Sequence, residues 1–325
     1  MSTSNSINFT QSQIELIQDA FTLIGRYSIG KTLSPEDLAI AQRFLNKMVK
    51  AWSAKGLHLW AKEEGILFLT PYVGEYSLSS TSGVKFSTKD DSTTTKLTSS
   101  AITTATSLTV ESTTGMVVSD KIGVVLDTGY LQWTTIAAIP SSTSVTINAA
   151  LTGAAASGNL LYSYTTIGNK PLRILSCRLM SGLDSGTTTT QTEWPMTSIG
   201  YEDYYNIAMQ TTSGPQPNQF HYNPKVSDGK LLVWPRPTTA ANRIAYTFER
   251  TLQDLDTVTD NFDFPGEWLE CLTYQLAVRL GPIYGKDARA MQVLAPIASS
   301  LLEDLLDWDN EITSVRFTPE RGGYE

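Results

Sequence analysis

The segment whose residue types most directly suggest chemistry is 25–32, which reads Gly-Arg-Tyr-Ser-Ile-Gly-Lys-Thr. It matches the phosphate-loop pattern G-x-x-x-x-G-K-[ST], in which backbone amides surround the phosphates of a nucleotide and the lysine binds them. Further along, the apolar run 122–126 is followed by Asp127 and imitates the strand that ends in a magnesium-binding acid. Taken alone, these two segments would predict nucleotide hydrolysis.

The elements around this pattern favour a different interpretation. A phosphate loop needs a buried strand before it and a helix that opens at the lysine. Here an amphipathic helix capped by Thr10 is predicted before the loop, and the next helix begins at Ser34-Pro35, beyond Lys31. Asp127 lies in a threonine-rich region without alternating strands and helices. We therefore expect a helix–helix turn, with a P-loop nucleotide-binding protein kept as a remote alternative.

No other set of residues has the spacing of a catalytic or metal site. The two histidines, His58 and His221, stand in aromatic-rich, strand-like contexts, where a packed or hydrogen-bonded imidazole is the common case. Adjacent acids such as Glu202-Asp203 point apart on a helix or a strand. Cys177 and Cys271 lie far apart without metal-type spacing. The sequence therefore predicts no enzyme, no cofactor and no metal site.

Composition narrows the class of protein. The chain has 325 residues, of which 41% are hydrophobic, and a formal net charge of -8 at pH 7. This length suits two domains or one domain with an insertion. The negative charge argues against a surface built mainly to bind phosphates. Because the sequence shows neither a long apolar run nor a signal-peptide pattern, we expect no membrane span and no secretory signal. The two widely spaced cysteines fit a protein made in a reducing cytosol.

The predicted elements change in kind along the chain. Leu38, Ala41, Leu45, Met48 and Trp52 recur at three- and four-residue steps, so they share one helix face. Next comes a stretch rich in serine, threonine and valine, whose short β runs separated by turn signals predict a small barrel or sandwich. Later apolar runs predict a three-stranded meander and then two more helices. The three meander runs are residues 219–222, 230–234 and 243–248.

These elements predict an α+β fold, with an antiparallel core of about four helices, a small β-meander and an inserted all-β barrel or sandwich domain. Residues 1–78 and 166–310 would form the two halves of the helical core, the second half including the meander. Residues 79–165 would form the inserted Ser/Thr-rich β domain, and residues 311–325 an extended C-terminal arm. We expect the insert to be separable, so that a short linker in place of residues 82–162 leaves a soluble helical remainder.

The order of these motifs resembles a known family. One helix ends in Leu45-Asn46-Lys47-Met48-Val49-Lys50-Ala51-Trp52 and is followed by Gly56-Leu57-His58-Leu59-Trp60. The C-terminal half adds Tyr201-Glu202-Asp203-Tyr204, Leu231-Leu232-Val233-Trp234-Pro235-Arg236-Pro237 and Phe264-Pro265-Gly266-Glu267-Trp268. Over residues 9–78 and 171–320, the chain resembles the head-to-tail adaptor proteins of podophages, also called head-completion or tail tubular A proteins. Its core signature is Leu45, Met48, Trp52 and Trp60.

The resemblance implies a structural virion protein at the head–tail junction, made in the host cytoplasm. It implies a homo-oligomeric ring of twelve copies that joins the portal protein to the tail nozzle and lines the DNA exit channel. Double-stranded DNA would pass without specific binding, which an acidic channel wall favours. A phage tail or capsid-decorating β-rich interaction protein is the alternative if the β region makes the larger interaction surface.

The tail of the chain is the candidate contact segment. Ile312, Val315 and Phe317 follow the last predicted helix, and Pro319 then opposes regular structure. Such a tail is either frayed or an arm that docks on a neighbour. As a hypothesis, Ile312, Val315, Arg316 and Phe317 contact the portal protein or an adjacent subunit.

Overall fold

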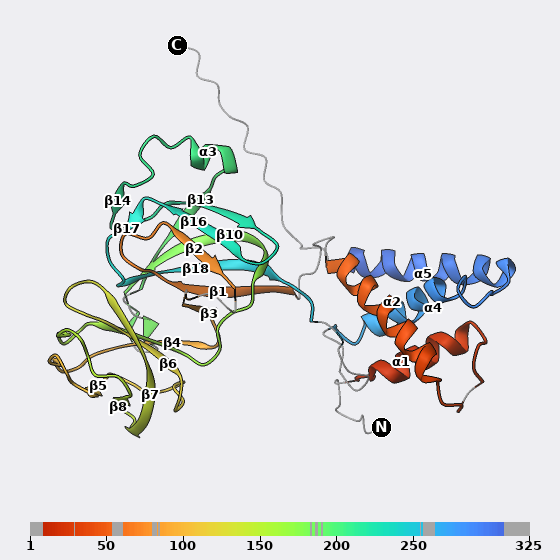
Figure 1. The fold of residues 1–325 in the computed structure, drawn as a ribbon, viewed down its shortest axis with the longest axis horizontal. Coiled ribbons are helices and arrows are strands. Elements are labelled where there is room, and N and C mark those ends of the chain that lie inside the picture. Colours follow the sequence, from red (N-terminus) through yellow and green to blue (C-terminus); the bar gives the residue numbers. More distant parts are fainter. Residues whose placement is uncertain are drawn as a thin grey trace, which may run out of the picture. The chain divides into compact units, whose positions relative to one another are not determined.

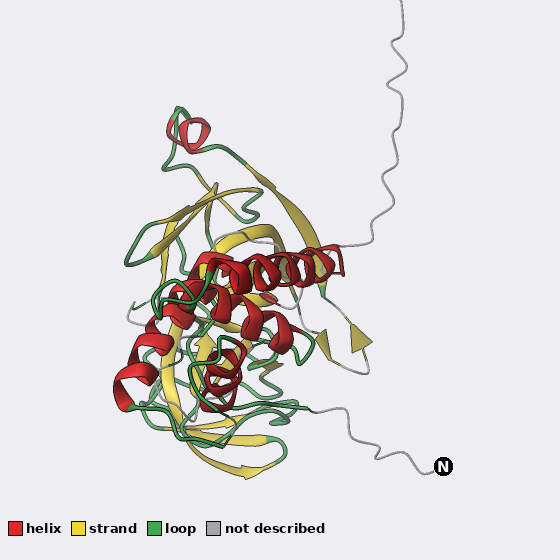
Figure 2. Cartoon of the chain, turned by 90° about the vertical axis from the view of Figure 1, so that its right-hand side faces the viewer, coloured by secondary structure: helices red, strands yellow, loops and turns green. Residues whose placement is uncertain are grey.

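The computed structural model of the protein describes residues 9–28, 30–53, 61–79, 83, 85–182, 184–185, 188–189, 191–253, 255 and 264–308. The chain divides into two compact units, one made of residues 1–60 with 252–325 and the other of residues 61–251. Within the described residues the first unit is built from helices and the second mainly from strands (Figures 1 and 2).

The helical unit is organised around one central helix. Its helices are α1 (Gln13–Leu23), α2 (Pro35–Ser53), α4 (Trp268–Leu280) and α5 (Ala288–Trp308). Helix α4 packs against each of the other three. Trp268, Leu272, Leu276 and Leu280 on α4 are all fully buried. A helix surrounded by others must be apolar on most of its circumference, which explains this run of large apolar residues.

The first helix begins two residues later than the predicted cap implies. Ser12, not Thr10, is the residue before the helix. The backbone amide and the hydroxyl of Ser12 donate to the Glu15 carboxylate, at 2.9 and 2.7 Å. A carboxylate in the first turn also interacts favourably with the helix dipole. If Thr10 were the cap, the residue three positions later would be Gln13, which carries no charge.

The β unit contains an eight-stranded sheet that curls around a single core. All neighbouring strands are antiparallel except β13 and β15, which are parallel. One hydrophobic cluster takes side chains from every one of the eight strands, so the sheet forms a nearly closed, barrel-like structure. In spatial order the strands are β2 (Glu75–Leu78), β16 (Gly229–Trp234), β15 (Gln219–Pro224), β13 (Thr192–Ser198), β10 (Pro171–Ser181), β18 (Asn242–Arg250), β1 (Lys62–Phe68) and β3 (Phe86–Thr88).

A second sheet of six strands closes on itself around its own hydrophobic cluster. The two strands at the ends of the spatial order meet, because Leu97, just after β4, pairs with Val110, just after β5. The backbone bonds from Thr98 N to Thr109 O and from Glu111 N to Lys96 O, both 3.0 Å, close the ring of strands. In spatial order these strands are β4 (Ser92–Lys96), β9 (Leu160–Tyr164), β6 (Lys121–Val125), β7 (Leu131–Ser141), β8 (Ser144–Ile147) and β5 (Ser107–Thr109).

The two sheets share a third hydrophobic cluster. Successive side chains of a strand point to opposite faces, and on β1 Leu67 enters the core of the eight-stranded sheet. Ile66 and Phe68 point the other way and pack with Tyr162 and Tyr164 of β9. The Phe68 ring lies 5.1 Å from Tyr162 and 5.7 Å from Tyr164, between centroids. The apolar run in β1 is therefore buried on both faces.

Short elements complete the β unit. A five-residue helix, α3 (Tyr201–Tyr205), stands on a loop that projects from the end of β13 (Figure 1, green). Two pairs of two-residue strands form separate small sheets. They are β11 (Asp184–Ser185) with β12 (Thr188–Thr189), and β14 (Ser213–Gly214) with β17 (Arg236–Pro237).

The predicted fold class is wrong. It placed an antiparallel core of about four helices at the centre of the molecule and limited the remaining sheet to a small meander. The structure is instead mostly β-sheet, with a nearly closed eight-stranded sheet as its largest element. The strands 62–68 and 75–78 were assigned to the helical core, whereas they pair with strands from residues 229–250. Such pairings between distant segments leave no local trace in the sequence.

The predicted three-stranded meander is also wrong. β15 and β16 are neighbours, but β18 lies on the far side of the sheet, between β10 and β1. Ile244, Ala245 and Tyr246 on β18 are all buried, so this strand needs covered faces on both sides. Ile244 and Tyr246 enter the core of the eight-stranded sheet, and Ala245 enters the cluster shared with the six-stranded sheet, so both faces of β18 are covered where it lies.

Candidate functional site

Two distant parts of the sequence meet in the core of the helical unit. Leu45, Met48 and Trp52 of α2 are buried. The Trp52 ring lies 5.7 Å from Trp268 and 6.3 Å from Phe264, between centroids. These aromatic pairs are in the distance range of edge-to-face and tilted packing. The residues that carry the family resemblance in each half of the chain therefore share one cluster.

The other predicted site residues cannot be placed in this geometry. Trp60, the fourth residue of the core signature, lies outside the described residues, as does His58. The candidate contact residues Ile312, Val315, Arg316 and Phe317 also lie outside them. Their proposed contacts stay predictions.

The segment that matches a phosphate loop connects α1 to α2. A helix rather than a strand precedes Gly25, and α2 begins at Pro35, beyond Lys31. The side-chain amide of Gln18 donates to the carbonyl of Lys31, at 2.8 Å, and ties the turn back to α1. Asp127 belongs to the other unit, where its carboxylate accepts from the Ala156 amide at 2.8 Å. The strand before the loop and the helix opening at the lysine, which a phosphate loop needs, are thus not found among the described residues between 13 and 53.

Replacement of Lys31 by alanine is expected to leave folding and assembly unchanged. The side chain is exposed, and the contact to Gln18 uses only the backbone carbonyl. The free energy of unfolding should change by less than about 0.5 kcal/mol. Calorimetric titration with Mg-ATP should show no binding to either protein. Measurable ATP binding by the wild type, lost together with assembly in Lys31→Ala, would contradict the helix–helix turn.

A buried carboxylate of α2 joins this turn to the connection between α4 and α5. Asp37 in the first turn of α2 accepts hydrogen bonds from the hydroxyls of Tyr27 and Tyr284, the latter at 2.7 Å. Arg26 approaches the same carboxylate at 3.5 Å and lies over the Tyr284 ring. Burial alone would raise the pKa of Asp37, but the hydrogen bonds from Tyr27, Tyr284 and Ser34 outweigh it and leave the pKa lowered. Burial and the Asp37 carboxylate raise the pKa of Tyr284 to about 12.

We expect Asp37 to make the helical unit less stable in acid. Because its pKa is lower in the folded state than the ordinary value of 3.8, the unfolded state binds a proton more readily. The stabilisation is complete above the ordinary pKa and is lost as the pH falls through the folded-state pKa. Melting temperatures measured between about pH 7 and pH 2 should fall more steeply for the wild type than for Asp37→Asn. Equal slopes for the two proteins would contradict this role, and Asp287→Asn, at an exposed position, is the control.

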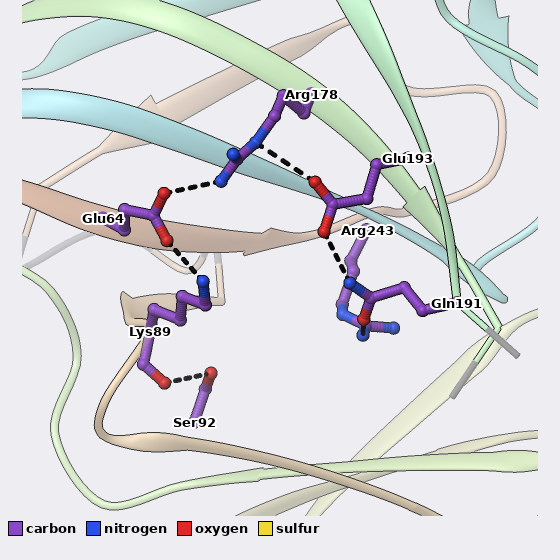
Figure 3. A network of polar contacts seen from close by, with 7 residues as sticks. All are labelled: Glu64, Lys89, Ser92, Arg178, Gln191, Glu193 and Arg243. Atoms are coloured by element: carbon purple, nitrogen blue, oxygen red, sulfur yellow. Dashed lines mark hydrogen bonds and ion pairs between the residues drawn. The ribbon is translucent and has the colours of Figure 1, made fainter. Parts of the chain in front are cut away.

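A chain of polar and charged side chains crosses part of the eight-stranded sheet (Figure 3). Glu64 on β1 accepts from Lys89 and from Arg178 on β10, both at 2.6 Å. Arg178 also approaches Glu193 on β13 at 3.5 Å. Gln191 donates to Glu193 at 2.6 Å and accepts from Arg243 on β18 at 2.7 Å, so the chain runs from the β3 end of the sheet to β13.

This network is suited to hold strands together rather than to transfer protons. The hydrogen bond from Lys89 is the main cause that lowers the pKa of Glu64, with Arg178 adding to it against the opposing effect of burial. A carboxylate kept ionised between two cations is a weak general base. A hollow of about 380 Å³ beside the network is lined by Lys62, Glu63, Glu64, Thr88, Lys89 and Asp90. Its charges are of both signs, so it favours neither a cation nor an anion.

The remaining histidine supports the loop that carries α3. Nδ1 of His221 lies 2.9 Å from the carbonyl oxygen of Ile199, which makes Nδ1 the protonated nitrogen. The His221 ring also packs edge-on against Tyr201. Tyr201, Tyr205 and Met209 are 52%, 50% and 68% exposed, which gives the loop an unusually apolar surface for a projecting segment. The loop is therefore a candidate contact surface.

The described residues contain neither a candidate metal site nor a candidate membrane-spanning helix. Within it, no group of three or more histidine, cysteine, aspartate or glutamate side chains could hold a metal ion. None of the described helices is long and apolar enough to cross a membrane.

The polar contacts described above escaped prediction for a common reason. Asp37 was interpreted only as a capping acid, although its partner Tyr284 is 247 residues away. Glu64 and Arg178 are separated by 114 residues. The one local signal was an acid placed on a face of α2 that is otherwise apolar, which indicates a partner from another element.

Comparison with known proteins adds no family assignment, since neither a protein-family model nor a curated protein matches this chain.

Proposed function

We propose that the chain is a structural subunit of the head-to-tail adaptor ring of a podophage virion, with no enzymatic activity. In this role it joins the portal protein to the tail nozzle and lines the DNA exit channel as one of twelve copies. The observation that carries the proposal is the meeting of Trp52 with Phe264 and Trp268 in one core. Motifs from both ends of the family resemblance, which are far apart in the sequence, are thereby neighbours in space.

The rest of the described structure is compatible with a structural role, because its polar clusters connect secondary-structure elements to one another. The polar clusters around Asp37 and Glu64 are neutralised internally and serve as ties between elements. The net charge of -8 favours a wall along which DNA slides without sticking.

A phage tail or capsid-decorating interaction protein is the second candidate. It is favoured by the size of the β unit and by the exposed Tyr201, Tyr205 and Met209 on the loop with α3. Such a protein would attach through this surface to the outside of the particle instead of to the portal.

Attachment to portal particles separates the two candidates. The full chain would be mixed with portal rings from the phage that encodes it, and bound copies would be counted by light scattering after size exclusion. An adaptor is expected to bind portal at one copy per portal subunit. A decorating protein is expected to ignore portal rings and bind capsids, and that result would overturn the proposal.

Truncation after Asn310 tests the predicted contact segment. If Ile312, Val315 and Phe317 bury their side chains on the portal protein or an adjacent subunit, each contributes about 1.5–3 kcal/mol, repeated around the ring. Removal should therefore weaken portal attachment severely while leaving the melting temperature of the free subunit nearly unchanged. Undiminished pull-down of the truncated chain on portal particles would show that other residues make the joint.

A further inference from the structure

Helix α5 carries charges toward both of its ends that oppose its own dipole (Figure 1, blue). Arg289 stands in the first turn, where the partial charge of a helix is positive, and no acidic residue shares that turn. Glu303 and Asp304 stand in the last two turns, where the partial charge is negative, and the last turn carries no base. Each charge is therefore unfavourable unless a group of opposite sign comes near.

These three charges are not neutralised inside the described part of the chain. Arg289, Glu303 and Asp304 are exposed, and none of them makes an ion pair with another described residue. Asp287, just before the helix, accepts from the backbone amide of Arg289 at 3.5 Å and so serves the backbone of the first turn. Opposite charges at the two ends of one helix face are thus both open to another molecule.

An exposed apolar patch lies between the two charged ends. Val293 and Ile297, one turn apart, are 63% and 41% exposed, and Pro296 between them is exposed as well. An apolar centre flanked by charges is the pattern of a small contact surface. The stripe recurs at steps of three or four residues and consists of Arg289, Val293, Ile297, Ser300 and Asp304.

We infer that the α5 stripe docks on the same stripe of a second copy of this chain, with the two helices antiparallel. An antiparallel pair brings Arg289 of each copy to Asp304 of the other and leaves Pro296 and Ile297 at the centre. Both ends of both helices then receive the opposite charge that their own chain does not provide. A parallel pair would bring Arg289 to Arg289 and Asp304 to Asp304, and like charges across a contact are unfavourable.

The spacing of the residues selects one register for this pair. Both helices rise about 1.5 Å per residue, so equal sequence offsets lie at equal heights. With Arg289 level with Asp304 of the other copy, Val293 falls level with Ser300, and Glu303 lies close to the same guanidinium. A shift of four residues one way sets Arg289 level with Ser300 and loses the charge pair. The opposite shift sets Val293 level with Asp304, which places an aliphatic side chain against an acid.

The inference goes beyond the proposed function. Copies in a ring around one axis meet head to tail through two different faces. The α5 contact uses the same face twice, so it is complete with two copies. The pair therefore joins free subunits and is not the contact between neighbours within one ring. Its failure would leave the adaptor role untouched, because portal binding is scored separately.

The basic residues of α2 are the competing partners for the acids of α5. Arg43 and Lys47 are exposed on one face of that helix, one turn apart. In a parallel arrangement with Asp304 level with Lys47, however, Val293 falls level with the exposed Glu36. An antiparallel arrangement with the same charge pair would put the apolar patch level with residue 54, beyond the end of α2. A contact with α2 thus matches the acids but not the apolar patch.

Charge reversal tests the inference with the full chain. A contact of one helix face on each side is small, so sedimentation at low salt is run up to about 500 µM protein. The wild type should show a monomer–dimer equilibrium without larger species. The dissociation constant should rise about tenfold or more in Arg289→Glu and in Asp304→Arg. An equimolar mixture of these two variants should associate more tightly than either alone, because opposite charges then meet at both ends of the pair.

Reversal on α2 is the matched control. Arg43→Glu/Lys47→Glu should dimerise as the wild type does, because α2 takes no part in the inferred contact. Loss of association in this variant would show that the acids of α5 bind α2, and the inference would be wrong. A wild type that stays monomeric, or a mixture no tighter than its components, would overturn it as well.

Cysteine cross-linking tests the symmetry of the contact. The native Cys177 and Cys271 are buried. The two copies of Ile297 lie beside the two-fold axis, so Ile297→Cys treated with a short bis-maleimide should give a covalent dimer. Ala288→Cys, at an exposed position, should give none, because its two copies lie about 25 Å apart along the helices. Absence of the dimer from Ile297→Cys, or equal cross-linking of Ala288→Cys, would contradict the antiparallel pair.

Discussion

Trp268→Ala is expected to lower the free energy of unfolding of the helical unit by about 3–5 kcal/mol. Trp268 is fully buried at the start of α4, the helix that packs against α1, α2 and α5. Its ring contacts Trp52 and Phe264, so its loss leaves a cavity between two aromatic residues that cannot close without moving a helix. A loss of this size is comparable with the whole stability of a small helical unit.

Urea unfolding followed by far-ultraviolet circular dichroism measures this effect, since most helices belong to the same unit. Trp194→Ala on β13 is the matched control, because this tryptophan is 36% exposed and lies in the other unit. The helical transition should move to lower urea in Trp268→Ala and stay in place in Trp194→Ala. A loss below about 1 kcal/mol in Trp268→Ala would show that the aromatic cluster is not the centre of this core.

The helices of the first unit were predictable because their signals are local. Ser34 accepts a hydrogen bond from the Asp37 amide at 3.2 Å, and Pro35 is the first residue of α2. The three- and four-residue spacing of Leu45, Met48 and Trp52 corresponds to their common burial. Capping residues and periodic spacing act within a few residues of one another, so one sequence is enough to detect them.

The arrangement of the strands was not predictable from the same kind of signal. Runs such as residues 121–126 and 144–147 were correctly interpreted as strands, because β-branched residues alternate or cluster there. Their partners are set by contacts between segments far apart in the chain. The clearest available clue was the apolar run around Ile244, which indicates a strand covered on both faces but does not identify its neighbours in the sheet.

The candidate contact surfaces were partly visible in the sequence. The basic residues of α2 and the acids of α5 can be read directly, but their exposure cannot. Their exposure follows from the packing of α4 against both helices, which turns most of their apolar side chains inward and leaves Arg43, Lys47, Glu303 and Asp304 in water. The role of Glu64 as a link between β1 and β10 depended on strand order, which the sequence did not give.

Deletion of the six-stranded sheet is expected to leave an insoluble remainder, contrary to the expectation from sequence. Replacement of residues 82–162 by a linker removes β3, and with it Phe86 from the core of the eight-stranded sheet. It also removes Tyr162, which is fully buried and donates to the carbonyls of Ala240 and Ala241 at 3.2 and 2.9 Å. The deletion of residues 82–162 therefore leaves a gap in the core of the eight-stranded sheet. It also exposes the face of β1 that carries Ile66 and Phe68.

A narrower deletion separates these two effects. Replacement of residues 92–164 keeps β3 and Phe86 but still uncovers Ile66, Phe68 and Met180, which are at most 3% exposed in the full chain. Each large apolar side chain returned to water costs about 1.5–3 kcal/mol, and together they form an exposed apolar patch that favours aggregation. Both deletion proteins should therefore be recovered mainly in the insoluble fraction. The protein that lacks residues 82–162 should also refold with a lower yield than the protein that lacks residues 92–164.

The decisive comparison uses the same substitutions in two backgrounds. In the full chain, Ile66→Thr, Phe68→Ser and Met180→Thr should be destabilising, because they bury hydroxyls and leave cavities beside Tyr162 and Tyr164. In the chain lacking residues 92–164, the same three changes should increase the soluble fraction, because the positions then face water. Opposite signs in the two backgrounds would show that the two sheets depend on a shared core. Good solubility of the unsubstituted deletion protein would show that the six-stranded sheet is an independent insert after all.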